Sequence, residues 1–209
     1  MKVAVHNIKG KETAKKVDLK KNIFGIEPND HAIYLDVKQY LANQRRGTSK
    51  TKERGEITGS RRKIRKQKGS GMARVGDIKN PIFRGGGRIF GPKPRDYDSK
   101  LNKKVKRLAR KSALSYKAKD NNIIVLEDFS FDTPKTKEYL NILNNLDQLN
   151  SKTLMVLSDV NKNIFLSSRN LKKAKVVRAS DLCTYEIMNA NKLLILEGSV
   201  KEIEETLNK

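Results

Sequence analysis

Residues 45–95 concentrate the two residue types that best suit close contact with a polyanion. These 51 residues hold 17 of the 46 Lys and Arg residues and ten of the 13 glycines, but only three acidic residues. Arg offers a planar fork of donors to phosphate oxygens, and glycine lets backbone N–H groups approach a phosphate without a Cβ in the way. Only ten of the 51 residues are apolar, too few for a core. We expect this segment to be disordered alone or ordered by nucleic acid.

The net charge of +23 lies entirely in the first part of the chain. Residues 1–120 carry 34 basic and 11 acidic residues, whereas residues 121–209 carry 12 of each. A solvated tail would be terminal, but the basic segment is flanked by helical and strand patterns on both sides. Internal loops longer than about 15 residues are usually functional or disordered. The sequence therefore predicts one α/β domain, residues 1–209, with an RNA-binding arm inserted at 45–95.

The residues available for catalysis or metal binding form no recognisable motif. His6, His31 and Cys183 are scattered, so no zinc ligand set is visible and no intramolecular disulfide can form. Gly69 and Gly71 match the first two positions of Gly-x-Gly-x-x-Gly, but Arg74 occupies the third and no strand precedes them. No apolar run approaches a membrane span. We predict no enzymatic activity, no cofactor and no metal, in a reducing cytoplasmic setting.

Apolar runs after residue 120 predict a mostly parallel sheet. Residues 123–126, 154–157, 176–177 and 193–196 are apolar without alternation, which is typical of strands buried on both faces. The chain begins with two shorter strand patterns, and Ser199 to Glu202 fits a capping box at the start of the last helix. We predict a Rossmann-like open α/β sandwich with a long extended basic arm. The predicted helices lie near residues 30–44, 101–116, 134–146, 181–188 and 199–207.

RNA suits this arm better than duplex DNA. No helix-turn-helix, zinc finger or basic zipper is visible, and an irregular arm fits crevices in folded RNA. Two other functions stay open: a regulatory RNA-binding protein, and an RNA-modifying enzyme on a Rossmann-like body. The predicted RNA-binding residues are the cations of the arm and of the helix after it: Arg45, Arg46, Lys50, Lys52, Arg54, Arg61, Arg62, Lys63, Arg65, Lys66, Lys68, Arg74, Lys79, Arg84, Arg88, Lys93, Arg95, Lys103, Lys104 and Arg107.

Three stretches of the arm, residues 67–74, 79–87 and 90–97, resemble the bacterial uL4 family of large-subunit ribosomal proteins. The resemblance continues through residues 101–105, 112–115, 134–137 and 169–171, so it covers nearly the whole chain. It implies a non-enzymatic structural component of the large ribosomal subunit in the cytoplasm, with an α/β body outside and an arm that penetrates 23S rRNA.

The same resemblance implies partners and a role for the arm tip. In the family, the protein binds 23S rRNA early, assists assembly and contacts neighbouring ribosomal proteins including uL22. Its arm tip lines the polypeptide exit tunnel beside the nascent chain, and some relatives also bind the leader mRNA of their own operon. Carried onto this sequence, the tip consists of Gln67, Lys68, Gly69, Ser70, Gly71, Met72, Ala73 and Arg74.

Overall fold

The computed structural model describes residues 1–208, and the chain forms two units. One unit, called the body, combines Met1–Leu41 with the chain from Lys100 onward, and the other is Ala42–Ser99. Lys209, where the predicted domain ends, lies outside the described residues.

The body contains a six-stranded sheet in which five strands are parallel. The strand order is β2-β1-β3-β6-β4-β5, and only the pair β1 and β2 is antiparallel. This confirms a mixed α/β fold with a mostly parallel sheet. The order differs from the 3-2-1-4-5-6 order of dinucleotide-binding domains. The strands are β1 (Lys2–His6), β2 (Glu12–Asp18), β3 (Ile123–Leu126), β4 (Thr153–Leu157), β5 (Ala174–Arg178) and β6 (Lys192–Leu196).

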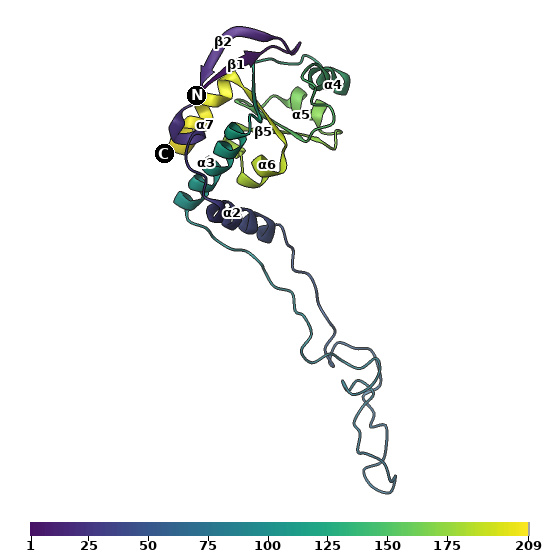
Figure 1. Ribbon diagram of the computed structural model, residues 1–209. Coiled ribbons are helices and arrows are strands. Elements are labelled where there is room, and N and C mark those ends of the chain that lie inside the picture. Colours follow the sequence, from purple (N-terminus) through teal and green to yellow (C-terminus); the bar gives the residue numbers. More distant parts are fainter. Residues whose placement is uncertain (209) are drawn as a thin grey trace. The chain divides into compact units, whose positions relative to one another are not determined.

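Helices cover both faces of this sheet (Figure 1). Along β4, Leu154 and Val156 join the core beneath α1, α3, α6 and α7, while Met155 and Leu157 face α4 and α5. This explains the unbroken apolar runs predicted as strands, because alternate side chains of these strands pack into the cores on the two faces of the sheet. The helices are α1 (Lys21–Phe24), α2 (Asp30–Asn43), α3 (Lys103–Lys119), α4 (Thr136–Asn145), α5 (Lys162–Ser168), α6 (Thr184–Asn189) and α7 (Glu197–Asn208), with a 3-10 turn, η1, at Ala179–Asp181. Among residues 1–208, no helix has the length and apolar character to cross a bilayer.

The capping box predicted at Ser199 is wrong. Helix α7 begins at Glu197, so Ser199 lies inside its first turn and is fully buried. Its hydroxyl donates to the carbonyl oxygens of Leu196 (2.7 Å) and Val156 (3.1 Å). The N–H of Gly198 instead donates to Oδ1 of Asp128 at 3.2 Å, so a residue 70 positions earlier supplies the cap.

Helix α5 was missed by the sequence patterns because it is short and gives little periodicity. Its start is nevertheless marked by Asn161, whose side chain accepts hydrogen bonds from the N–H groups of Asn163 and Ile164. Ile164 is completely buried, whereas Phe165 is about half exposed. Seven residues with one deeply buried aliphatic side chain do not make a recognisable stripe.

The Ala42–Ser99 unit has a different kind of order from the body. Apart from the last two residues of α2, its described residues form turns and bends without helix or strand. Two limbs, residues 45–66 and 75–99, are joined by the tip, residues 67–74 (Figure 1). Local organisation in this unit must therefore come from contacts between the limbs rather than from regular structure.

Replacing Tyr139 with Phe should stabilise the body. The Tyr139 side chain is completely buried, and its hydroxyl has no hydrogen-bond partner among the described residues. Tyr139→Phe should raise the free energy of unfolding by about 1 kcal/mol, measured by urea denaturation, because an unsatisfied buried hydroxyl opposes folding. Tyr34→Phe, at a side chain that is 56% exposed, is the matched control and should change little. A loss of 1 kcal/mol or more in Tyr139→Phe would mean that the hydroxyl has a partner.

The advantage of Tyr139→Phe should grow at high pH. Burial raises the pKa of Tyr139 well above its ordinary value. Above about pH 10 the unfolded chain loses this proton while the folded chain keeps it, so the wild type loses stability as the pH rises. The difference in unfolding free energy between the two proteins should widen by up to about 1.4 kcal/mol per pH unit.

Candidate nucleic-acid interface

Every acidic residue of segment 45–95 is engaged by a cation of the same segment. Lys93 contacts Glu53 at 2.6 Å, and Lys50 contacts Glu56 at 2.6 Å. Arg54 lies 3.0 Å from Asp77, whose side chain is only 10% exposed. The other 14 of the 17 cations have no carboxylate within ion-pair distance among the described residues. We call these 14 residues the unpaired cations.

The three ion pairs organise the unit more than they stabilise it. The hydrogen bond from Lys50 lowers the pKa of Glu56, and the hydrogen bond to Glu53 raises the pKa of Lys93. The groups of these two pairs are exposed, and exposed ion pairs contribute little to stability, whereas the Asp77 carboxylate that pairs with Arg54 is largely buried. Two of the pairs, Glu53 with Lys93 and Arg54 with Asp77, join one limb to the other. Glu53 and Asp77 therefore help to fix the pairing of the limbs.

Backbone hydrogen bonds connect the limbs at several levels. These bonds resemble an irregular ladder, with distances of 3.0 to 3.2 Å, and they require no apolar core. They run from the N–H of Arg95 to Gly47, of Thr51 to Pro92, of Arg88 to Lys52 and of Ile64 to Gly76.

Two arginines, one from each limb, contact the aromatic ring of Tyr97. The guanidinium carbons of Arg45 and Arg95 lie 3.9 and 4.8 Å from the ring centroid of Tyr97. A hydrogen bond and the charge of Arg95 lower the pKa of Tyr97. Cation–π contact holds two like-charged side chains from opposite limbs on one ring.

Gly87 is required for the closest approach of the two limbs. A Cβ at this position would lie 2.4 Å from the backbone nitrogen and 2.6 Å from the Cα of Arg54. Such contacts with backbone atoms cannot be relieved by a side-chain rotation. The N–H of Gly87 donates to the carbonyl oxygen of Lys79 at 2.9 Å. Glycine here serves the packing of the protein against itself, as well as any approach of a ligand.

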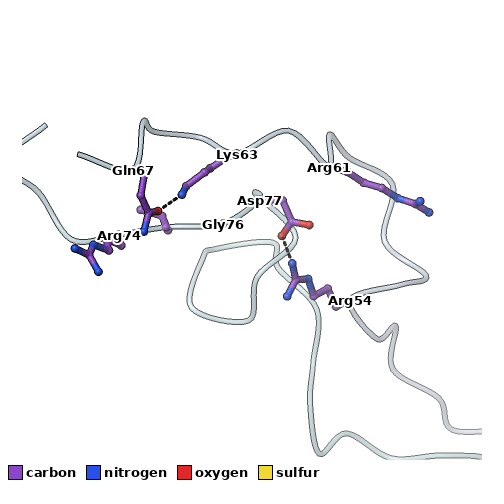
Figure 2. Close-up of a pocket in the computed structure, with 8 residues that line it drawn as sticks. Arg54, Arg61, Lys63, Gln67, Arg74, Gly76 and Asp77 are labelled. Atoms are coloured by element: carbon purple, nitrogen blue, oxygen red, sulfur yellow. Dashed lines mark hydrogen bonds and ion pairs between the residues drawn. The ribbon is translucent and has the colours of Figure 1, made fainter. Parts of the chain in front are cut away.

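A cationic groove of about 430 Å³ lies between the limbs near the tip. In Figure 2, Arg54 points toward Asp77, and Lys63 toward Gln67, to which it donates a hydrogen bond. Arg61 and Arg74 lie at opposite ends of this group in the same view. Both belong to the unpaired cations, so the groove offers separated positive charges to an extended anion. The groove is lined by Arg54, Arg61, Lys63, Gln67, Arg74, Val75, Gly76 and Asp77.

The tip turns on two glycines with a left-handed backbone. Gly69 has φ of +82° and Gly71 has φ of +62°, and a Cβ at either position would meet no atom within 4 Å. A substitution at these positions would strain the backbone without a steric clash inside the protein. Met72 beside them is 61% exposed.

The structure distributes the predicted RNA-binding residues over both units. Those of segment 45–95 belong to the Ala42–Ser99 unit and are mostly exposed, with Arg65 half-buried. Lys79 is only 8% exposed, and its side chain packs beside Gly59, so we leave it out of the proposed interface. Lys103, Lys104 and Arg107 lie in the first turns of α3 in the body, where the two lysines are exposed and Arg107 is half-buried.

Sequence reasoning missed the residues that hold the limbs together. It counted the three acidic residues only as part of the charge of the segment and did not single out Tyr97. A usable signal was present, because three carboxylates among 17 cations must each lie close to a cation. In the part of the chain that the structure describes, no group of three His, Cys, Asp or Glu residues could hold a metal ion.

Comparison with known proteins matches nearly the whole chain to one family of ribosomal proteins. Residues 17–206 match the model of the family described as "Ribosomal protein L4/L1 family". The chain is 61% identical over 209 residues to the large ribosomal subunit protein uL4 of Flavobacterium johnsoniae. It is 62% identical over 208 residues to the protein of that name in Christiangramia forsetii, and 60% identical over 208 residues to the one in Phocaeicola vulgatus. Each alignment covers 100% of both chains.

Replacing Gly87 with Ala should separate the limbs of the free protein. The clash with Arg54 should break the bonds around it, so the N–H of Arg88, bound to Lys52, should exchange with solvent at least about tenfold faster in hydrogen exchange by NMR. Gly55→Ala is the matched control, because a Cβ at Gly55 meets nothing within 4 Å. If Arg88 is already unprotected in the wild type, the unit is disordered without a ligand, as the composition alone predicts.

Proposed function

The chain belongs to the ribosomal protein L4/L1 family, and from this membership we propose that it is a structural, non-catalytic component of the cytoplasmic large ribosomal subunit that binds 23S rRNA through the Ala42–Ser99 unit. The observation that carries the proposal is the set of unpaired cations on a scaffold fixed by its own ion pairs and backbone bonds.

The chemistry of the unit supports RNA as the ligand. The unpaired cations repel one another, and a polyanion is the ligand that removes this repulsion over the full length of both limbs. The separation of Arg61 and Arg74 favours successive phosphates of a strand over one isolated anion. Phe90, which is 98% exposed, adds an aromatic face on which a base can stack.

The architecture we propose is a Rossmann-like body carrying an extended arm, residues 45–95, inserted in one α/β domain. Two limbs of about 25 residues reach at most ~80 Å when fully extended, enough to penetrate folded RNA. The three predicted cations that lie on the body, Lys103, Lys104 and Arg107 of α3, are included in the proposed RNA-binding set. The smallest side chains of the arm surround Gly69 and Gly71, so we place the tip, Gln67 to Arg74, at the exit tunnel.

At the tunnel, the proposed partners of the tip are uL22 and the nascent chain. Binding to the leader mRNA of its own operon is a further proposal, made only on the resemblance to relatives that do so. A cation set that recognises rRNA phosphates could also engage such an mRNA, because phosphate contacts carry no sequence information.

Binding to 23S rRNA fragments should weaken steeply with salt. Each Lys or Arg that neutralises a phosphate releases counterions, so about 8 contacts predict a slope near −7 for log K against log salt concentration. Filter binding between 50 and 300 mM KCl measures this slope. Neutral replacements of Arg61, Arg62, Lys63, Arg65 and Lys66 should reduce the slope by about 4 and impair subunit assembly.

The matched control carries the same number of neutral replacements on the body, at Lys135, Lys137, Lys162, Arg169 and Lys201. These residues are exposed and outside the predicted interface. A flat salt response, or equal losses of RNA affinity in the two variants, would rule out the Ala42–Ser99 unit as the principal RNA-binding part of the protein.

Enlarging the tip should change the tunnel without preventing assembly. Gly71→Phe adds bulk where the protein itself leaves space, so large subunits should form while nascent-chain passage and inhibition by tunnel-binding macrolides change. Sucrose-gradient profiles and macrolide inhibition curves measure the two effects.

Two further variants separate bulk from backbone strain. Gly71→Ala imposes the same left-handed strain with little bulk, and Gly55→Phe adds the same bulk away from the tip. Both should leave macrolide inhibition close to the wild type. An assembly defect in Gly71→Phe as severe as that of the five-residue charge variant would show that tip and limbs do not have separate roles.

A further inference from the structure

The two edges of the parallel sheet in the body carry opposite charge. The connections that enter β3, β4, β5 and β6, counted with their flanking helix and strand residues, hold six basic and two acidic residues. The connections that leave these strands, counted in the same way, hold three basic and six acidic residues. The entering segments are residues 119–123, 145–153, 168–174 and 189–192, and the leaving segments are 126–136, 157–162, 178–184 and 196–197. Since parallel strands all begin at one edge, the neutral second half of the chain has a basic amino edge and an acidic carboxyl edge.

Lysines of the amino edge lie side by side on neighbouring strands. Thr153, the first residue of β4, pairs with the first residue of β5 and with Lys192, the first residue of β6. The N–H of Thr153 donates to the carbonyl oxygen of Lys173 at 2.8 Å, and the N–H of Lys192 donates to that of Lys152 at 3.1 Å. Adjacent strands lie about 4.8 Å apart, so the backbone of this row spans about 10 Å. Lys172 lines the same surface hollow as Lys152 and Lys173. We call Lys152, Lys172, Lys173 and Lys192 the edge lysines.

Neutral oxygen atoms, rather than carboxylates, hold the side chains of the edge lysines. Three of them donate from Nζ to an oxygen of a neighbouring loop: Lys152 to Oδ1 of Asn189 at 3.3 Å, Lys173 to the carbonyl of Asn150 at 2.9 Å, and Lys192 to the carbonyl of Asn121 at 3.1 Å. Within residues 1–208, no edge lysine forms an ion pair, whereas nearby Lys175 is paired with Glu186 at 2.5 Å. These hydrogen bonds restrict the ammonium groups without neutralising their charge.

The acidic carboxyl edge gives the body a preferred orientation toward a polyanion. Two of its six acidic residues have cationic partners, since Asp181 pairs with Arg178 at 2.6 Å and Glu197 with Lys15 at 3.8 Å. The other four, Glu127, Asp128, Asp132 and Asp159, form no ion pair with a residue that the structure describes. One edge therefore attracts a polyanion and the opposite edge repels it.

We propose that the edge lysines bind the sugar–phosphate backbone of an RNA duplex and so form a separate RNA-binding surface on the body. The proposal rests on the proposed function and adds to it a contact that orients the body on rRNA. A lysine ammonium is a compact charge with rotatable donors, which suits phosphate oxygens. Single-stranded RNA is recognised largely by stacking on aromatic rings, whereas duplex RNA is recognised by its shape and phosphates. The four entering segments contain no aromatic residue, so the duplex is the ligand that fits.

The test titrates the full chain with an RNA duplex of about 16 base pairs and follows backbone amides by NMR. The cations Arg61, Arg62, Lys63, Arg65 and Lys66 are neutralised in this protein, so that RNA binding by the Ala42–Ser99 unit does not mask the body. The duplex should shift the resonances of residues 150–153, 172–174 and 190–193. Replacing all four edge lysines with Gln should remove these shifts and reduce the slope of log K against log salt concentration by about 3.

The matched control removes the same charge elsewhere on the body, through Lys135→Gln, Lys137→Gln, Lys162→Gln and Lys201→Gln. These side chains are exposed and belong to none of the four entering segments. The control should keep the duplex-induced shifts and change the slope by less than about 1. Both variants should keep the wild-type Tm, because Gln retains a hydrogen-bond donor. The shifts with unsubstituted edge lysines test the proposal even where a variant unfolds.

Polyglutamate serves as a second polyanion and represents an acidic protein partner. Shifts at the amino edge that polyglutamate matches at equal charge concentration would overturn the assignment to RNA. Absence of shifts there with the duplex, or equal losses in the edge-lysine and control variants, would overturn the proposal as well. With the Ala42–Ser99 unit intact, replacing the edge lysines should leave the shifts that 23S rRNA fragments cause in that unit unchanged. Failure of the unit to bind rRNA is therefore distinguishable from failure of the edge lysines.

Discussion

Repulsion among the unpaired cations of residues 45–95 constrains the organisation of the whole chain. Fourteen positive charges without a carboxylate partner cannot be packed against an apolar core, because desolvating them would cost far more than the core could offset. The chain places them in a unit without helix or strand, and its apolar runs form a separate sheet. Two acidic residues of the unit, Glu53 and Asp77, form ion pairs where the limbs meet.

This constraint also explains why the unit is held together by hydrogen bonds, ion pairs and one cation–π contact rather than by apolar packing. A core is excluded by composition, so the N–H and C=O groups of opposite limbs bond to one another beside the ion pairs of Glu53 and Asp77. Such bonds need close approach, which Gly87 permits beside the backbone of Arg54. The glycines of this segment thus have two functions. Gly87 is required for contact within the protein, whereas Gly69 and Gly71 turn the chain where no other part of it is near.

The sequence predicted the sheet well because its strands are apolar on both faces. Residues 123–126, 154–157 and 193–196 were assigned from composition alone, and all three runs lie in β3, β4 and β6. The failures arose where distant residues decide the structure. Ser199 matched a local capping motif, yet Asp128 caps the helix from another loop. The pairing of Arg54 with Asp77 across the limbs is non-local in the same way, so charge could be predicted from the sequence but its arrangement could not.

Unsatisfied buried polar atoms in the body have two different explanations, and their surroundings distinguish them. The hydroxyl of Tyr139 is isolated in an apolar core between α4 and the sheet, where phenylalanine would fill the same space. The unpartnered oxygen of Glu186 belongs to a carboxylate whose other oxygen holds Lys175 at 2.5 Å, so no apolar residue could replace it. A lone hydroxyl in a core is a tolerated cost. The Glu186 carboxylate is instead retained for an ion pair that joins α6 to β5, and neither local periodicity nor net charge could have indicated that pair, because β5 reads as a purely structural strand.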